Sequence, residues 1–434
     1  MRKILLVLLV IGLVGLSVGP AVAVSVSWNK VYGGVIQTGG GKIIEDERYF
    51  SMQLNAPLNS TLVRRANGEY LLRAHPGKAV ASAFRTYRVN AVGKNLGTIL
   101  NSPIAIQNTP DGGFVSVSSV NSAYKQTAYV VSKYNKNNAL VWKKTIPVEA
   151  PKNSLDINAI AVTKNGEIVV GGGEFGAEAD KYRVVLKKFT ANGAFVWSKI
   201  LVAGNLTPMI NSIRPTMDGG VIVSGQRDVE VAGASVAFVM IVDADGAVNL
   251  DKEIVSCNEA AVDAVQLSNG SVIVVSNVLQ SYSVDPKIWD YITNRTFWAT
   301  RVSVFSATGT MQTERFVQAM FPTDTVADLC NSFSKLTENE MLVEPVSIKS
   351  SMIQPTADGG FLLTGTRSAG IKIKKQKDQM WVTKLDAELG TVWEKEFASG
   401  DNQYGYVGLE KAPGEYVVAG VNKKGQRVVQ TFIK

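Results

Sequence analysis

Histidine is almost absent from this chain, and cysteine is rare. The 434 residues contain one His, His75, and two Cys, Cys257 and Cys330. Zinc and copper sites are built from clusters of His and Cys, and a Ser-His-Asp triad needs a His beside its nucleophile. The stretch "LLRAHPGKA" around His75 has neither metal-ligand spacing nor a nucleophile elbow, so we interpret His75 as a polar residue at the end of a strand. We therefore expect no catalytic residue, metal ion or cofactor.

Long apolar runs are lacking after the N-terminus. The chain opens "MRKILLVLLVIGLVGLSVGPAVAVS", with Arg2 and Lys3 before an apolar run and a small-residue site that ends at Ala23. This pattern predicts a signal peptide over 1–23. The alternative is an uncleaved anchor, but Ser, Gly and Pro interrupt the run. We expect a secreted or cell-envelope-associated protein, extracellular or periplasmic, with no membrane span after cleavage.

Charged residues are sparse and of both signs. They make up 19% of the chain, against 46% hydrophobic residues, and the net charge is +8. Such a weak basic bias suits anionic envelope polymers or lipids. The one basic cluster, "IKIKKQKDQ" at 371–379, carries Lys372, Lys374, Lys375 and Lys377. No aromatic residues interleave with these lysines, which argues against nucleic acid, and the alternative to an anionic partner is a solvated loop.

A short turn motif recurs along the chain. "TPDGGFVSVSS" at 109, "TMDGGVIVSGQ" at 216 and "TADGGFLLTG" at 356 place Asp-Gly-Gly between short apolar runs. Related turns bring the number of copies to seven, most of them 44 to 55 residues apart, with glycines at Gly68, Gly112, Gly166, Gly219, Gly270, Gly359 and Gly414. Such turns favour tight β-hairpins, and a period of this length indicates a propeller or solenoid. We interpret the Asp-Gly-Gly as turn chemistry and not as a ligand site.

A second hairpin follows the first in most copies, as in "KFTANGAFVWSKI" at 188–200. Four strands are the content of a propeller blade. The last copy stops after three strands, and the missing one resembles 24–34, "VSVSWNKVYGG", with Trp28 in the place of Trp142, Trp197 and Trp393. The sequence therefore predicts an all-β fold: residues 24–434 form one seven-bladed β-propeller of four-stranded antiparallel blades, closed by pairing of the N-terminal strand with the C-terminal blade.

On these motifs the chain resembles secreted prokaryotic β-propellers with repeated "DGG" turns and "W-x-K" strands. Leu250 and Gln312 replace the Trp of the final strand in two copies. The stretch "LDAELGTVWEKEFASG" is also similar to the tryptophan-docking repeat of quinoprotein dehydrogenases, although Trp393 lies one position short of that pattern. The resemblance implies the fold and no quinone site, so we expect the Trp residues to pack between blades.

Three insertions interrupt the repeat, at 35–57, 277–298 and 321–349. In a four-stranded blade all three connections emerge on the same face as the basic cluster, and insertions concentrated on one face commonly mark a binding face. We expect the third to contain a short helix near 325–336, and we count Trp289 and Tyr291 with the four lysines as candidate binding residues. The alternative is that the insertions only plug the channel or brace neighbouring blades.

The two cysteines lie in links that flank blade five, on the insertion-bearing face. In an oxidising compartment they can form one disulfide, which would pin the long insertion without straining a sheet. We predict a Cys257–Cys330 bridge, and the alternative is two separately buried thiols.

These observations favour a non-catalytic binding or envelope-associated scaffold module, monomeric, that engages protein or polysaccharide through its insertion-bearing face. One alternative is an extracellular enzyme, either a glycan-cleaving enzyme that uses loop carboxylates such as those at 45–47 or a quinone-dependent dehydrogenase. Another is a structural spacer in a surface layer. The "DADG" at 243–246 carries calcium-type carboxylates but lacks the remaining ligands, and it falls where each blade needs a turn.

Overall fold

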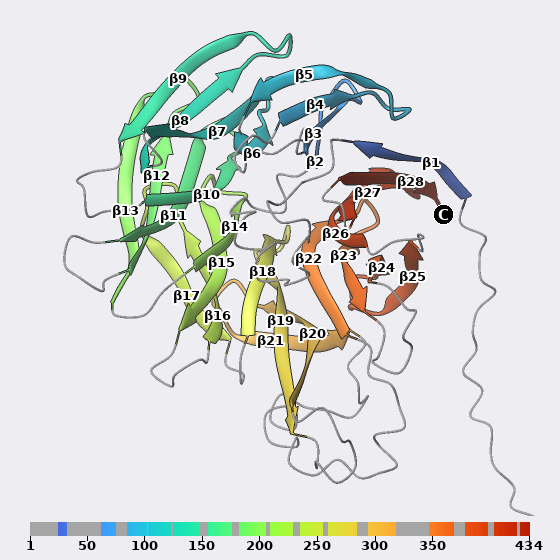
Figure 1. The fold of residues 1–434 in the computed structure, drawn as a ribbon. Helices are drawn as coiled ribbons and strands as arrows, with labels where there is room; N and C mark the ends of the chain where they lie inside the picture. The colour runs from blue at the N-terminus through green and yellow to red at the C-terminus, as the bar shows by residue number, and fades with distance from the viewer. Residues whose placement is uncertain are drawn as a thin grey trace, which may run out of the picture.

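The computed structural model shows a ring of seven antiparallel sheets around a central channel (Figure 1). It describes residues 25–32, 62–74, 85–101, 103–122, 125–147, 155–175, 182–204, 209–228, 235–254, 259–283, 294–317, 347–368, 378–397, 403–422 and 426–434. All regular structure in these ranges is β, and each sheet has four strands. The seven-bladed propeller predicted from the turn repeat is confirmed.

Each blade places its strands in sequence order from the channel outward, with the closing blade as the exception. Blade one has β2 (Leu62–Arg64), β3 (Tyr70–Ala74), β4 (Arg85–Val89) and β5 (Asn95–Asn101). Blade two has β6 (Pro103–Asn108), β7 (Phe114–Ser122), β8 (Lys125–Tyr134) and β9 (Leu140–Pro147). Blade three has β10 (Leu155–Val162), β11 (Ile168–Phe175), β12 (Tyr182–Phe189) and β13 (Phe195–Gly204).

The remaining blades follow the same order. Blade four has β14 (Met209–Pro215), β15 (Val221–Asp228), β16 (Ser235–Val242) and β17 (Val248–Ile254). Blade five has β18 (Glu259–Gln266), β19 (Val272–Ser283), β20 (Asn294–Phe305) and β21 (Met311–Val317). Blade six has β22 (Ser347–Pro355), β23 (Phe361–Ser368), β24 (Gln379–Leu385) and β25 (Thr391–Phe397). Blade seven has β26 (Gln403–Ala412), β27 (Glu415–Asn422) and β28 (Arg427–Ile433), with β1 (Ser25–Tyr32) as its outer strand.

The N-terminal strand closes the ring. β1 pairs antiparallel with β28, with Trp28 opposite Thr431, and the blue and red strands lie side by side in Figure 1. Within the predicted closing segment 24–34, the strand itself spans Ser25–Tyr32. Pairing the two ends of the chain completes blade seven, which would otherwise have three strands and an open edge.

The first hairpin turn of each blade explains why Asp-Gly-Gly recurs. In blade two, Thr109 N–H donates to Gly113 O and Gly112 N–H donates to Thr109 O, both at 3.0 Å. Gly112 has φ +80°, a left-handed conformation that favours glycine. Gly113 is required for a different reason, because a Cβ there would collide with the carbonyl oxygen of Tyr134. The same pair of constraints applies at 219–220 and 359–360.

The outer hairpins carry the tryptophans that connect neighbouring blades. Trp142 and Trp197 each lie opposite a lysine of the preceding strand, and their Nε1–H groups donate to Ala191 O at 3.1 Å and Ala244 O at 3.0 Å. Both acceptors belong to the second hairpin turn of the next blade. The expectation that these Trp residues pack between blades therefore holds for blades two and three.

The strand register corrects one assignment in blade five. A one-residue bulge precedes the Trp position, so Thr313, opposite Val304, is the equivalent of Trp142. Gln312, which the sequence pattern placed there, is the bulged residue. Blades two, three, four and six carry the same bulge in their outer strands, so the Trp position lies equally far from the turn in each blade and the composition-based assignment was one residue off.

The core consists of apolar layers between adjacent blades. Between blades three and four, for example, Leu186 packs in one buried cluster with Ile213 and Phe238. At the closure, Trp393 of blade six meets Phe432 of blade seven edge to face, with ring centroids 5.7 Å apart. Each such side chain contributes roughly 1.5–3 kcal/mol by leaving water. Burial of apolar side chains between adjacent blades therefore stabilises the ring. The rigid ring holds the connections between its strands in fixed positions.

Candidate functional site

The propeller has two chemically different ends. Because neighbouring strands are antiparallel, both hairpin turns of a blade lie at one end of the ring, which we call the turn end. The connections from the second strand to the third, and from the outer strand to the next blade, lie at the opposite end, which we call the loop end. The strands that flank 33–61, 284–293 and 318–346 all have their connected termini at the loop end.

Most of the sequence-predicted site residues lie outside the described residues. This applies to the segment 1–23, the insertion 35–57, His75 and the expected helix at 325–336. It applies equally to the predicted disulfide and to the candidate binding residues, which are Cys257, Cys330, Trp289, Tyr291, Lys372, Lys374, Lys375 and Lys377. The described part of the loop end consists of the strands that lead into these segments.

The second insertion is in large part β-structure and not a loop, which corrects the sequence prediction for 277–298. β19 and β20 are each 12 residues long, against eight for β11 and β12 of blade three. Their ladder is continuous from Val272–Phe305 to Ser283–Asn294. In Figure 1 the yellow β19 runs beyond the ends of the neighbouring strands. The third insertion ends earlier than predicted, because 347–349 belong to β22.

The base of this β19–β20 hairpin is fixed to blade six. The Asn277 carboxamide donates to Ser350 O and accepts from Ser350 N–H, both at 2.8 Å. Thr300 adds a hydroxyl contact with Ser350 Oγ at 2.8 Å and donates to Ile348 O at 3.2 Å. Asn277, Thr300 and Ser350 are all buried. A buried polar group is costly unless it is satisfied, so these bonds define one orientation of the hairpin on its neighbour.

An ionic layer crosses blade five itself at the same level. Glu259 on β18 accepts from Ser276 and from Arg301 Nη1, which is 3.1 Å away. The Arg301 guanidinium also donates to Glu314 on β21, at 2.9 Å from Nε and 2.5 Å from Nη2. Side chains from all four strands therefore meet in one network. Glu259, Ser276 and Arg301 are buried and Glu314 is exposed, and the hydrogen bonds among the buried groups rigidify the sheet from which the hairpin projects.

A single carboxylate connects three blades along the channel wall. Asp263 on β18 accepts from Ser212 Oγ at 2.6 Å and from Arg214 Nη2 at 2.6 Å, both on β14 of blade four. It also accepts from Ile353 N–H on β22 of blade six at 3.1 Å. The Asp263 side chain is 1% exposed. This carboxylate is surrounded by donors from the protein, which suits a structural role at the centre of the ring.

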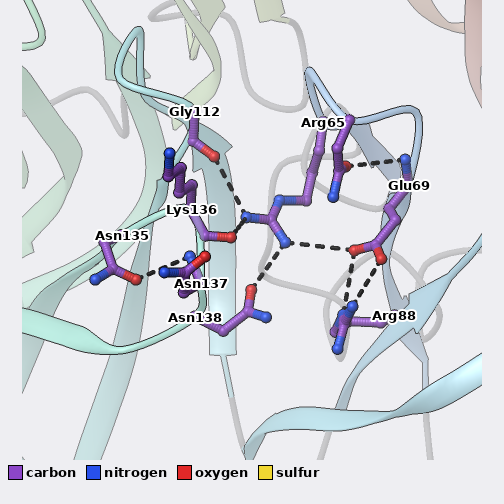
Figure 2. A network of polar contacts seen from close by, with 9 residues as sticks. Arg65, Glu69, Arg88, Gly112, Asn135, Lys136, Asn137 and Asn138 are labelled. Atoms are coloured by element: carbon purple, nitrogen blue, oxygen red, sulfur yellow. Dashed lines mark hydrogen bonds and ion pairs between the residues drawn. The ribbon is translucent and has the colours of Figure 1, made fainter.

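At the turn end, an arginine network joins blades one and two (Figure 2). Arg65 Nη1 donates to Asn138 Oδ1 at 2.8 Å, and Nη2 donates to Lys136 O at 2.7 Å and Gly112 O at 3.3 Å. Glu69 stands beside Arg65 and binds Arg88 at 2.7 Å. Burial lowers the pKa of Arg65, and the nearby Glu69 opposes that shift. Arg65 was not identified from the sequence. The only indication in the sequence is that four other copies of the turn motif have Thr at the position equivalent to Arg65.

A second set of contacts at the turn end connects blades through one equivalent residue of each inner strand, which is the last residue in blades one to six and Glu410 in blade seven. Four of these seven residues reach the preceding blade. Gln266 Oε1 accepts from Met217 N–H at 3.0 Å, and Glu410 Oε2 accepts from Ala357 N–H at 2.6 Å. Bridges of the same kind run from Asn108 to Arg64 O and from Arg64 to Lys411 O. The other three positions are Val162, Pro215 and Pro355, whose side chains have no polar group that could make this bridge.

A hollow lies where two successive bridges are missing. Its volume is about 530 Å³, within the usual range for ligand sites of roughly 300–1,000 Å³. Three equivalent tripeptides from blades two, three and four line it, at 108–110, 162–164 and 215–217. The hollow therefore opens at the turn end, away from the insertions, and no sequence pattern indicated it.

The titratable groups near the turns serve structure. Burial raises the pKa of Asp111, but hydrogen bonds from Lys133, Thr109 and Gly113 N–H outweigh it and bring the pKa to about 2. Thr356 and Lys384 likewise lower the pKa of Asp358 to about 2. Among the described residues, no group of three or more His, Cys, Asp or Glu is placed to hold a metal ion. No helix within the described ranges is long and apolar enough to span a membrane.

No family model and no curated protein matches this chain. Among solved structures, it is similar to the Pan2 WD40 domain of Neurospora crassa, with 11% identity, a TM-score of 0.45, and 92% of this chain and 94% of that chain covered. It is also similar to the β-propeller domain of the Trilobed protease from Pyrococcus furiosus, with 9% identity, a TM-score of 0.45, and 86% and 91% covered. Both likenesses concern the fold alone.

Proposed function

We propose that this protein is a secreted, non-catalytic recognition module that binds a protein or polysaccharide of the cell envelope or extracellular space at its loop end. The observation that carries the proposal is the β19–β20 hairpin, which extends beyond the neighbouring blades and is locked at its base by Asn277 and Ser350. A hairpin that only closed its blade would need no such extension.

The hydrogen bonds between Asn277 and Ser350 at the base of the hairpin favour binding, because ordering a mobile segment on binding costs conformational entropy. A mobile loop loses that entropy when a partner orders it, whereas a hairpin held by buried hydrogen bonds has already lost it on folding. The ionic layer of Glu259, Arg301 and Glu314 stiffens the sheet below in the same way. The candidate residues Trp289 and Tyr291 belong to the link that this hairpin carries, so the proposal assigns them to the contact surface.

The protonation states of the described carboxyl groups favour binding over glycan cleavage. A glycosidase needs a carboxylic acid with a raised pKa beside a second carboxylate. The described carboxyl groups with a shifted pKa are Glu69, Asp111, Asp218 and Asp358, and all four are lowered. These four groups stay ionised at neutral pH and are not suited to act as the general acid; the loop carboxylates at 45–47 lie outside the described residues.

The decisive experiment shortens the hairpin without disturbing its base. Residues 280–297 are replaced by Asn-Gly, so that Leu279 and Trp298, which are paired in the ladder, flank a two-residue turn. The matched control replaces 229–234 of blade four, also at the loop end, by the same turn between Asp228 and Ser235. Both proteins and the parent are incubated with the envelope fraction of the producing cell, and saturable capture is quantified.

We expect the parent and the blade-four control to capture the same component, and the shortened variant to lose at least tenfold in affinity. Equal affinity of all three proteins would contradict the proposal. A second variant, with Lys372, Lys374, Lys375 and Lys377 changed to Ser, tests whether the basic cluster adds to the same surface. Secretion is tested separately: N-terminal sequencing of the mature protein is expected to begin at Val24, and an intact residue 1 would contradict cleavage.

A further inference from the structure

The hollow at the turn end combines the volume of a ligand site with a backbone donor that has no acceptor among the described residues. In blades four and six, the second residue of the first turn donates its backbone N–H to a side chain of the next blade: Met217 to Gln266 and Ala357 to Glu410. The equivalent residue of blade three is Lys164, which lines the hollow. No described residue accepts from Lys164 N–H, because the next blade places Pro215 where a Gln or Glu would be. Ser268 of blade five, which faces Pro355, also has no acceptor among the described residues but does not line this hollow.

The protein fills this position with the Gln266 carboxamide beside blade four and with the Glu410 carboxylate beside blade six. The Glu410 carboxylate receives the Ala357 N–H at 2.6 Å, a short charge-assisted bond. At the hollow the backbone donor comes with a cationic residue, because Lys164 itself lines the hollow and is exposed. The remaining lining is mainly apolar, with Pro110, Val162, Pro215 and Met217 around it.

We propose that the hollow binds the carboxylate of a Glu side chain in an extended acidic segment of a partner protein. The carboxylate takes the position that Glu410 of blade seven takes beside the first turn of blade six, accepts from Lys164 N–H and pairs with Lys164 Nζ. Apolar residues that flank this Glu pack on Val162, Pro215 and Met217. The site goes beyond the proposed function and lies at the opposite end of the ring, so either can fail without the other.

The bond between Glu410 and Ala357 N–H suggests the test, because a carboxylate can be introduced at the equivalent position, Pro215. Pro215→Glu gives blade four the residue that blade seven has at Glu410, and this carboxylate is expected to fill the hollow from within. Pro355→Glu is the matched control, since Pro355 occupies the equivalent position in blade six but does not line the hollow. The probes are fluorescein-labelled Leu-Glu-Leu-amide, the same peptide with Gln, and the same peptide with Ala, measured by anisotropy.

We expect the Glu probe to bind the parent and Pro355→Glu equally, the Gln probe to bind at least tenfold more weakly, and the Ala probe not to bind. Pro215→Glu is expected to lose the Glu probe while remaining folded. Lys164→Glu, a change on the exposed surface, is expected to weaken the Glu probe at least tenfold more than the Gln probe. Absence of Glu-probe binding to the parent at millimolar concentration, or undiminished binding to Pro215→Glu or to Lys164→Glu, would overturn the proposal.

Discussion

Trp142 of blade two donates its indole N–H to the carbonyl oxygen of Ala191 in blade three, at 3.1 Å. The same carbonyl accepts from Lys133, which lies opposite Trp142 in the sheet and pairs with Asp111 at 2.8 Å. Blade three repeats the arrangement with Lys188 toward blade four. A turn carboxylate, a lysine and a tryptophan thus connect one blade to the second turn of the next.

Replacing Trp142 by Phe keeps an aromatic ring against Gly193 but removes the N–H that Ala191 O accepts. We expect a loss of about 1 kcal/mol in the free energy of unfolding, typical of one hydrogen bond. Urea denaturation of the purified protein measures it. Val141→Ala, at an exposed position of the same strand, serves as the control and should be within about 0.5 kcal/mol of the parent.

The two glycines of one turn should differ sharply in what they tolerate. Gly113→Ala forces a Cβ into the carbonyl oxygen of Tyr134, and we expect it to cost about 2 kcal/mol or more. Gly112→Asn makes only an ordinary contact, with Lys136 Cβ at 3.7 Å, and Asn accepts the left-handed conformation, so about 1 kcal/mol is expected. Thermal unfolding ranks the two variants. A Gly112→Asn variant less stable than Gly113→Ala would contradict the steric explanation.

The Asp263 carboxylate should contribute strongly to the stability of the folded protein. Asp263→Ala leaves Arg214 without its partner and removes the acceptor for Ser212 and Ile353 N–H, so we expect a loss of about 3 kcal/mol or more. The comparison is Glu253→Gln, which breaks an ion pair with Arg227 on an exposed strand and should cost at most about 1 kcal/mol. Similar losses from both variants would show that Asp263 is dispensable.

Acid should weaken the ring through the turn carboxylates. The pKa values of Asp111 and Asp358 are about 2 in the folded protein, below the ordinary value of about 3.9. A depressed carboxyl pKa contributes stability above the unfolded value and loses it as the pH falls toward the folded value. We therefore expect the melting temperature to fall between about pH 4 and pH 2. The double variant Asp111→Asn, Asp358→Asn should fall less steeply over the same interval.

The blades were predictable because each repeats the same local chemistry. The first turn needs glycine at one position because of its positive φ, and at the next because a Cβ would not fit, as at Gly112 and Gly113. These two requirements produce a recognisable sequence motif. The Trp positions were visible for a similar reason. Strand bulges produced no such motif, since the bulged residues of the inner strands include Ile104, Asn211 and Tyr406, which share no property.

The candidate sites were harder to predict because they depend on neighbours that are distant in sequence. The extension of β19 and β20 looked like a loop insertion, since its strands gain their regularity from pairing with each other. Pro215 is unremarkable by itself. It marks the hollow only when its position is compared with Gln266 and Glu410 in the ring.

Recognition by the β19–β20 hairpin is tested most directly by amide hydrogen exchange of the full chain with and without the captured envelope component. The proposal predicts slower exchange on binding in the extended part of the hairpin, at 279–283 and 294–298, with the outer strands of the other blades unchanged. Unchanged exchange in those two segments, with protection confined to other blades, would contradict recognition by the β19–β20 hairpin.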